Sequence, residues 1–494
     1  MNLLGIDIGT THCKAALFDE RGILLNIATI ATPRFQDPAY GYFFDPEAIW
    51  QATAQVVADA IAEAPPNEIA GVAVASMAET GLLIDRQSGT PRTAMLPWFN
   101  TSAQAQAEIL EAVAGGMAGF QTSGIRPSFK CSLAKLMWLK QVDPAQLTNS
   151  VWLSAADYIV YRLTGQFITD YSLAGRTFAY DIQDRRWKTS LLRELGLSPD
   201  LFPPVRPSGT MLPARGDGLL AAGTPVCVAG HDHICAVTTL GDSASAAVLD
   251  SMGTAESLVG SYAAVSFGQA EYDSGLSFGC HVLPDQLYWL GGLSSSGGSI
   301  EWLRGQFNDK GLSYDEVQTL LAQVSGPTGI LFFPFLAGGS ILPANSSARA
   351  SLLGLTAKHG RAHILKAILE GTAFEMARIR QLAEALLSRS IKQVVAVGGG
   401  TQNAGWLQVK ADVYGHDVVV PAQQEATLLG AALIAGIGCG LYADVTAALQ
   451  AVRQPPARIF QPDLDNHSRY QQLYETGYLK LLPLLQDYYS GASG

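Results

Sequence analysis

The stretch LLGIDIGTTHCK, residues 3–14, decides the fold. The apolar run up to Ile8 predicts a β-strand, the Gly-Thr-Thr turn breaks it, and the apolar residues that resume at Ala15 predict a returning strand. Glycine lets the backbone of such a turn lie close to a phosphate group, and amides and threonine hydroxyls can donate hydrogen bonds to phosphate oxygens. An ordinary tight turn between two strands is the alternative for this stretch taken alone.

Within this stretch, Gly9, Thr10 and Thr11 are the candidate phosphate contacts. Lys14 is a candidate for additional positive charge, and Asp7 is a candidate for holding a Mg²⁺-bound water. The chain has no Gly-Lys-Ser/Thr sequence, so this turn is not a Walker loop.

Outward from this stretch, strand patterns alternate with helical ones. A helix is expected to begin at Asp45-Pro46, because aspartate caps a helix well and proline suits its first position. Residues 69–75 and 393–397 predict buried strands, and residues 362–387 predict a long helix. This alternation predicts an α/β fold.

The second half opens on AAVLDSMGTA, residues 246–255, which repeats the order of an apolar run, an acid and Gly-Thr. Two such matches almost half a chain apart indicate an internal duplication. We therefore expect domains at residues 1–245 and 246–494. Two facing loops could clamp a polyphosphate, which makes Gly253 and Thr254 candidates, although a lone Gly-Thr is a weak signal.

The composition excludes several classes of protein. The 494 residues are 48% hydrophobic and 15% charged, which excludes wholesale disorder. A net charge of −11 argues against nucleic acid as a partner. The six cysteines are scattered without a Cys-x-x-Cys pair, so neither a zinc site nor a disulfide framework is expected. With no signal peptide and no long apolar run, we expect a soluble, cytoplasmic chain that contacts no membrane.

A third polar segment is GHDH, residues 230–233, which follows an apolar run. A carboxylate just past a strand end faces a cleft in α/β folds, and Asp232 could take the proton of an alcohol during phosphoryl transfer. His231 and His233 raise a zinc interpretation, but the spacing shows no third ligand nearby. A capped strand end with surface histidines is the structural alternative.

Two further segments carry candidate binding groups. In the loops after residues 69–75, Glu79 and Asn100 could bind hydroxyl groups, and Trp98 could pack against the carbon face of a polyol, although a lone tryptophan is more often part of a core. The run GGGTQN, residues 398–403, allows the backbone to pass a flat ring, although a plain flexible turn explains three glycines equally well.

Taken together, these segments resemble the FGGY family of carbohydrate kinases, in the actin-like ATPase superfamily, over almost the full length. The resemblance rests on these sequences in this order: DIGTT at 7–11, DYI at 157–159, GHD at 230–232, GT at 253–254, FFPFLAG at 332–338, GGG at 398–400 and EAT at 425–427. It implies two ribonuclease-H-like domains with a cleft between them, and ATP with Mg²⁺ as cofactors. It also implies a small sugar or polyol as substrate, with a homodimer as one possible assembly.

By this resemblance Asp232 matches the catalytic base, and Asp7 and the two Gly-Thr loops match the phosphate and magnesium loops. The residues that match the adenosine site are Gly297, Glu301, Gly399, Gly400 and Asn403. Glu79-Thr80 is similar to the pair that glycerol kinases use on their polyol, and Trp98 matches a tryptophan on the substrate side.

Departures from the family pattern bear on the substrate. The arginine that precedes Glu-Thr in glycerol kinases is Ala78 here, and the common Trp-x-Asp-x-Arg reads WFNTS at 98–102. The GHDH segment and its surroundings look most like an L-fuculose-kinase-type subgroup. We therefore expect phosphorylation of a primary hydroxyl of a ketose such as L-fuculose or a pentulose, or of a polyol. Xylulokinase and glycerol or tetritol kinase are alternatives within the family, and an actin-like ATPase without sugar kinase activity is the alternative from another class.

Overall fold

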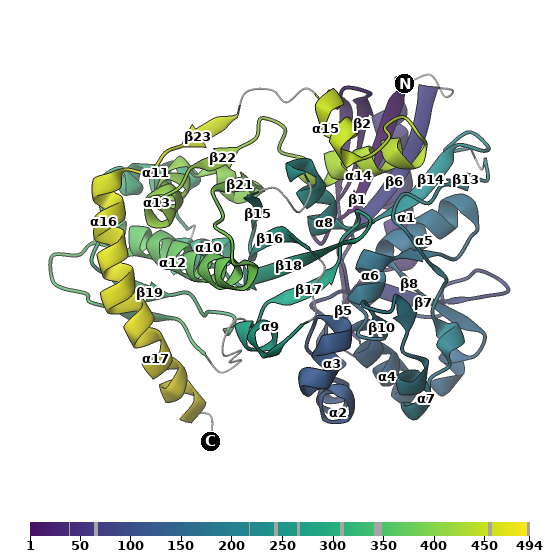
Figure 1. Cartoon of the computed structure of the whole chain (residues 1–494), viewed down its shortest axis with the longest axis horizontal. Helices are drawn as coiled ribbons and strands as arrows, with labels where there is room; N and C mark the ends of the chain where they lie inside the picture. The colour runs from purple at the N-terminus through teal and green to yellow at the C-terminus, as the bar shows by residue number, and fades with distance from the viewer. Residues whose placement is uncertain are drawn as a thin grey trace.

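The computed structural model describes residues 1–38, 40–63, 68–216, 218–241, 246–263, 267–306, 311–339, 348–452 and 457–491. The expected domain boundary at residue 245 lies outside these ranges. Two lobes, each built around one β-sheet, lie side by side (Figure 1). Within the described ranges, no helix has both the length and the apolar character needed to cross a membrane.

The first sheet is formed by the opening of the chain. Its order is β13 (Leu212–Pro213), β14 (Pro225–His231), β6 (Ile69–Ser76), β1 (Asn2–Ile8), β2 (His12–Asp19) and β3 (Leu24–Ala31). Strands β1, β6 and β14 run parallel, whereas β1–β2 and β2–β3 are antiparallel hairpins. One face is covered by α1 (Pro46–Ile61) and α5 (Ala155–Thr164), and the other by α8 (Asp232–Val237) and α14 (Ala426–Gly438). Burial on both faces explains the nearly continuous apolar sequence of these strands.

The second sheet repeats the arrangement of the first. Its order is β17 (Ser277–Cys280), β18 (Gln286–Leu293), β16 (Glu256–Ala263), β15 (Ala247–Met252), β21 (Gln393–Val397), β22 (Val418–Val420) and β23 (Arg458–Phe460). Strand β15 is antiparallel to β16 and parallel to β21, just as β1 is antiparallel to β2 and parallel to β6. The two similar sequence openings therefore occupy equivalent strands. The long helix α12 (Arg361–Leu387) and α10 (Gly297–Gln306) pack together in this lobe.

The helix α14 ties the end of the chain to the first lobe. It packs on β1 and β6 although its sequence lies more than 300 residues later, and Figure 1 shows it beside these strands. Glycines allow this approach: a Cβ at Gly5 would lie 2.2 Å from the carbonyl oxygen of Leu428, and a Cβ at Gly430 would lie 1.8 Å from that of Cys235. The backbones of α14, β1 and α8 are thus in direct contact.

The local signals read from the sequence give the expected elements. Asp45 caps α1 by accepting a hydrogen bond of 2.8 Å from the amide of Ala48. The strand expected at 393–397 has those bounds, and the long helix begins one residue earlier than expected. The remaining strands are β4 (Phe35–Asp37), β5 (Gly41–Phe43), β7 (Gly81–Asp85), β8 (Ser150–Ser154), β9 (Thr169–Asp170), β10 (Tyr180–Asp181), β11 (Arg186–Trp187), β12 (Val205–Arg206), β19 (Leu331–Phe333) and β20 (Ser351–Leu353). The remaining α-helices are α2 (Gln104–Ala114), α3 (Gly116–Ser123), α4 (Ser132–Val142), α6 (Tyr171–Gly175), α7 (Thr189–Glu194), α9 (Gln269–Ser274), α11 (Tyr314–Leu321), α13 (Ala404–Tyr414), α15 (Val445–Ala451), α16 (Leu464–Leu473) and α17 (Leu479–Gly491).

Candidate active site

Two carboxylates lie at one edge of the first sheet. Asp7 is near the end of β1, and Asp232 begins α8 directly after β14. Because β1, β6 and β14 are parallel, their carboxyl ends meet at this edge. Burial raises the pKa of Asp7 well above its usual value, and the negative charge of Asp232 raises it further. Burial also raises the pKa of Asp232, to which the charge of Glu79 adds.

The turn after β1 is tight and is tied to the sugar-side loops. The amide of Gly9 donates to the carbonyl of His12 at 3.0 Å, and a Cβ at Gly9 would lie 3.0 Å from that oxygen. The indole Nε1 of Trp98 donates to Oγ1 of Thr10 at 2.9 Å, whereas Thr11 is exposed. The predicted phosphate turn and the predicted sugar-side tryptophan are therefore in contact.

Lys14 has a partner that the sequence did not suggest. It lies opposite Asp7 in the β1–β2 pair, and its Nζ lies 2.8 and 2.9 Å from the two carboxylate oxygens of Glu425, the residue that precedes α14. Glu425 therefore balances the positive charge expected at this turn, and the ion pair joins the first sheet to α14.

Glu79 is held from two sides. Its backbone has a positive φ of 58°, and its carboxylate accepts hydrogen bonds from the Arg176 guanidinium, one of them 2.9 Å long at Nε. The buried Lys135 donates to its carbonyl oxygen and, at 2.8 Å, to that of Pro97. Burial lowers the pKa of Lys135 to about 7. Thr80 accepts a hydrogen bond of 3.1 Å from the amide of Trp98, so these contacts fix the two loops relative to each other.

Asn100 and Trp98 have different surroundings. The Asn100 side-chain nitrogen donates to the carbonyls of Tyr40 and, at 2.8 Å, Tyr42, so its amide supports the loop rather than facing open space. The half-buried Trp98 ring packs edge-on against Phe99 with the centroids 5.4 Å apart. A sugar contact by Asn100 stays a prediction, and the structure gives it a supporting role.

On the second sheet, two predicted nucleotide loops touch each other. The amide of Gly297 at the start of α10 donates to the carbonyl of Gly253 at 3.2 Å, and that of Gly298 donates to Thr254 at 3.0 Å. A Cβ at Gly297 would lie 2.4 Å from the Gly253 oxygen, so only glycine permits this approach. The loop after β15 and the start of α10 therefore form one unit.

The glycine run after β21 packs beside the end of β15. Gly398 has φ of +91°, and a Cβ at Gly400 would lie 2.8 Å from the Met252 side chain, whereas a Cβ at Gly399 would meet nothing within 4 Å. Asn403 caps α13 by accepting a hydrogen bond of 3.0 Å from the amide of Trp406.

Glu301, the remaining adenosine-side prediction, lies on α10. Its exposed carboxylate accepts hydrogen bonds of 2.7 and 2.8 Å from Arg304 and one of 2.8 Å from the hydroxyl of Tyr314.

A buried charge cluster supports the loop after β15. Lys410 Nζ lies 2.9 Å from Asp250 Oδ2 and also contacts the carboxylate of Glu256, and all three side chains are fully buried. Burial and the charge of Asp250 raise the pKa of Glu256 to about 8. Sequence reasoning missed this cluster, although a lysine in the apolar pattern of α13 and an acid within an apolar strand were its signals.

Several buried polar atoms around Asp232 lack a hydrogen-bond partner within the described part of the chain. They are Asp7 Oδ1, Arg176 Nη1, His231 Nδ1, His233 Nδ1 and the hydroxyl of Tyr288. Buried polar groups are nearly always hydrogen-bonded in proteins, so an accumulation of exceptions indicates a place where a polar ligand completes the bonding. Sequence reasoning had not singled out Arg176 or Tyr288.

The two histidines differ from the expected surface pair. His231 is buried, and burial lowers its pKa well below the usual value, so its ring is neutral near pH 7. Its Nε2 lies 3.2 Å from Asp232 Oδ1, which also accepts the amide of His233 at 2.7 Å. One ligand atom from each of these three residues lies within 4.8 Å of the others. The strand ends at His231 and α8 begins at Asp232, so the two rings do not share one face of a strand, as a His-x-His pattern within a strand would require.

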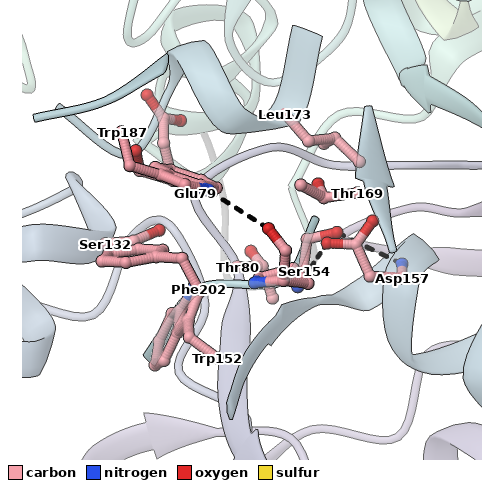
Figure 2. A pocket seen from close by; sticks show the side chains of 12 residues that line it. Glu79, Thr80, Ser132, Trp152, Ser154, Asp157, Thr169, Leu173, Trp187 and Phe202 are labelled. Carbon is pink, nitrogen blue, oxygen red and sulfur yellow. Dashed lines mark hydrogen bonds between the residues drawn. The ribbon is translucent and has the colours of Figure 1, made fainter. Parts of the chain in front are cut away.

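A cavity lies next to the sugar-side loops (Figure 2). Glu79 and Thr80 line it together with the aromatic rings of Trp152, Trp187 and Phe202. Its lining includes neither Asp7 nor Asp232. It therefore borders the candidate site without containing the pair of carboxylates.

Comparison with known proteins identifies the family. The model of the N-terminal domain of the FGGY family of carbohydrate kinases matches residues 2–239, and that of the C-terminal domain matches residues 270–439. The chain belongs to the FGGY family of carbohydrate kinases. Its lobes are the two domains of the FGGY kinase fold, of the actin-like ATPase type.

The FGGY relatives cover nearly the whole chain. A xylulose kinase of Bacillus subtilis is 28% identical over 484 residues, covering 96% of this chain and 95% of that protein. A glycerol kinase of Gloeobacter violaceus is 29% identical over 473 residues, covering 93% and 92%. The crystal structure of ligand-bound xylulose kinase from Lactobacillus acidophilus has a TM-score of 0.87 at 18% identity and covers 98% of each chain. The chain is thus an ATP-dependent carbohydrate kinase, and an ATPase without sugar kinase activity is set aside.

Proposed function

We propose that this kinase transfers the γ-phosphoryl group of ATP to a primary hydroxyl of a small ketose, a pentulose or L-fuculose, with Asp232 as the general base. The observation that carries the proposal is the convergence of Asp232 with the unpartnered polar atoms around it. In this proposal residues 1–245 bind the sugar and the phosphates, and residues 246–494 bind the adenosine.

The environment of Asp232 suits a base that must hold and release a proton. Burial raises its pKa toward neutrality, which strengthens its affinity for the proton of an alcohol. His231, neutral and 3.2 Å away at Nε2, orients one carboxylate oxygen without adding a competing positive charge. The other oxygen can then accept the hydroxyl hydrogen of the sugar.

The transfer follows from this placement. As the sugar oxygen forms its bond to the γ-phosphorus, Asp232 takes its proton, and the bond between the γ-phosphorus and the bridging oxygen breaks to leave ADP. The amides of Thr10 and Thr11 and that of Thr254 donate to phosphate oxygens on opposite sides, because the amides of Gly9 and Gly253 already bond to the carbonyls of His12 and Ala255. The unpartnered Oδ1 of Asp7 fits Mg²⁺ held directly or through water, and that ion would supply charge neutralisation on the phosphates.

A polyol is the second candidate class of substrate. Glu79, paired with Arg176, precedes Thr80, which is bonded to Trp98, so a carboxylate and an aromatic ring belong to adjoining loops, which suits glycerol or a tetritol. The similarity to glycerol kinases supports this alternative. Release of ADP with pentuloses, 6-deoxyketoses, tetritols and glycerol, one compound at a time, distinguishes the two classes.

The variant Asp232→Asn tests the base. It preserves the size of the side chain but cannot take the proton, so we expect turnover to fall about 10²-fold or more while ATP affinity, measured by calorimetry, is unchanged. Turnover close to that of the wild type would remove Asp232 from the mechanism. Lost ATP affinity would show instead that Asp232 organises the phosphate site.

A further inference from the structure

Tyr288 reaches the sugar side of the site from the other lobe. It lies on β18 of the second sheet, opposite Gly279 of β17, and it is fully buried. A Cβ at Gly279 would lie 2.6 Å from the Tyr288 hydroxyl oxygen, so glycine there makes room for the phenol to lie across β17. The helix α6 of the first lobe packs on β17, and Arg176 follows α6 directly.

The phenol is within electrostatic range of the pair that holds the sugar-side carboxylate. Burial raises the pKa of Tyr288 to about 12, the nearby Arg176 charge opposes this rise, and the Glu79 charge adds to it. The Tyr288 ring also meets the His231 ring edge-on, with the centroids 6.1 Å apart. Yet neither the Tyr288 hydroxyl nor Arg176 Nη1 makes a hydrogen bond of normal geometry.

We propose that Tyr288 is a positioning residue of the sugar site: its hydroxyl orients the Arg176 guanidinium, which in turn orients the Glu79 carboxylate toward the substrate. This inference rests on the proposed function, since it assigns the Glu79 side of the site to the sugar. Arg176 binds Glu79 through Nε and Nη2, which leaves Nη1 as the donor available to the phenol oxygen or to a sugar hydroxyl. The lobe that holds the adenosine therefore also shapes the sugar site.

The proposal predicts an effect on one substrate only. In the proposal the phenol–guanidinium hydrogen bond forms when the sugar binds, and loss of one hydrogen bond to a charged group corresponds to about a tenfold change in an equilibrium constant. In Tyr288→Phe we therefore expect the sugar KM to rise about tenfold while the KM for ATP is unchanged. Because the change removes a buried hydroxyl without a normal hydrogen bond, the midpoint of denaturant unfolding should not fall.

The matched control is Tyr180→Phe. Tyr180 is also fully buried with a hydroxyl that lacks a partner among the described residues, but it lies on β10 against Trp187. Burial raises its pKa, and the charged groups that also shift this pKa include Arg185 and Asp170 but neither Arg176 nor Glu79. We expect the sugar KM of this variant to equal that of the wild type. The double variant Tyr288→Phe/Arg176→Lys adds a second test. If Tyr288 acts only through Arg176, the sugar KM of the double variant should be no higher than that of Arg176→Lys alone.

Four results would overturn the proposal: an unchanged sugar KM in Tyr288→Phe, an equal rise in Tyr180→Phe, a parallel rise in the KM for ATP, or additive effects in the double variant. A wild-type enzyme that phosphorylates no sugar would instead contradict the proposed function. The two failures are therefore distinguishable in one set of measurements.

Discussion

The contact between α14 and α8 predicts that Gly430→Ala displaces Asp232, the proposed catalytic base, although residue 430 does not contact its side chain. A Cβ at residue 430 would lie 1.8 Å from the carbonyl oxygen of Cys235, whereas real Cβ atoms essentially never come within 3.0 Å of such an atom. The two helices must therefore separate by at least about 1.2 Å. Both partners are backbone in packed helices, so no flexible side chain can absorb the change.

The displacement is transmitted to the site along a short helix. Cys235 lies three residues after Asp232 in α8, which has only six residues, and Thr427 at the start of α14 lies 3.4 Å from the Asp232 carbonyl. A misplacement of about 1 Å costs roughly 10²-fold in rate where a base and a hydroxyl must be aligned. Overpacking of this kind also costs about 1–3 kcal/mol of stability.

The assay compares Gly430→Ala with Gly305→Ala, which adds the same methyl group within helix α10. A Cβ at Gly305 would meet nothing within 4 Å, so this control should retain full activity and equal or greater stability. We expect kcat of Gly430→Ala for the identified sugar to fall about 10²-fold, with a lower midpoint of denaturant unfolding. Activity and stability of Gly430→Ala equal to those of Gly305→Ala would refute the reasoning.

Two further outcomes follow from charges in the site. Burial lowers the pKa of Lys135 from 10.5 to about 7, so between these pH values the unfolded chain binds more protons than the folded chain. The free energy of unfolding should therefore rise between pH 7 and pH 9, by roughly 2 kcal/mol more in the wild type than in Lys135→Met. Parallel pH profiles of the two proteins in denaturant unfolding would contradict this prediction. Zn²⁺ prefers imidazole ligands and could bind the Asp232 carboxylate together with His231 and His233. We therefore expect Zn²⁺ to inhibit the enzyme competitively with the sugar. Inhibition competitive with ATP would contradict this prediction.

The sequence predicts local features of this kinase well. Each opening strand is a continuous apolar run that ends at glycine and threonine, so its existence follows from residues close together in the chain. Asp45 likewise acts as a cap because the partner amide lies three residues away. The predicted site residues Asp7 and Asp232 lie at the same edge of the first sheet because the parallel strands β1, β6 and β14 end there together.

Contacts between distant residues were not predictable in this way. Glu79 meets Arg176 and Lys14 meets Glu425 across 97 and 411 positions of sequence, and no local pattern pairs one charge with another at such separations. Asn100 shows another contact of this kind: its side-chain nitrogen donates to the backbone carbonyls of residues 40 and 42, which its place in a sugar-side loop did not indicate. Which polar groups are already satisfied is decided by tertiary packing.

The two equivalent strands show how one duplicated pattern gives two different acids. Asp7 and Asp250 both lie near the ends of their strands, ahead of a glycine-threonine turn. Asp250 is fully buried against Lys410, so its charge is neutralised and serves to hold the loop after β15. Asp7 has an oxygen without a partner, and the nearest lysine is shared with Glu425. Among the described residues Oδ1 of Asp250 also lacks a partner, so the two acids differ in the charge beside them: Asp250 contacts the Lys410 ammonium, whereas the Lys14 ammonium is paired with Glu425. This difference in neighbouring charge supports the proposal that Asp7, rather than Asp250, would hold Mg²⁺.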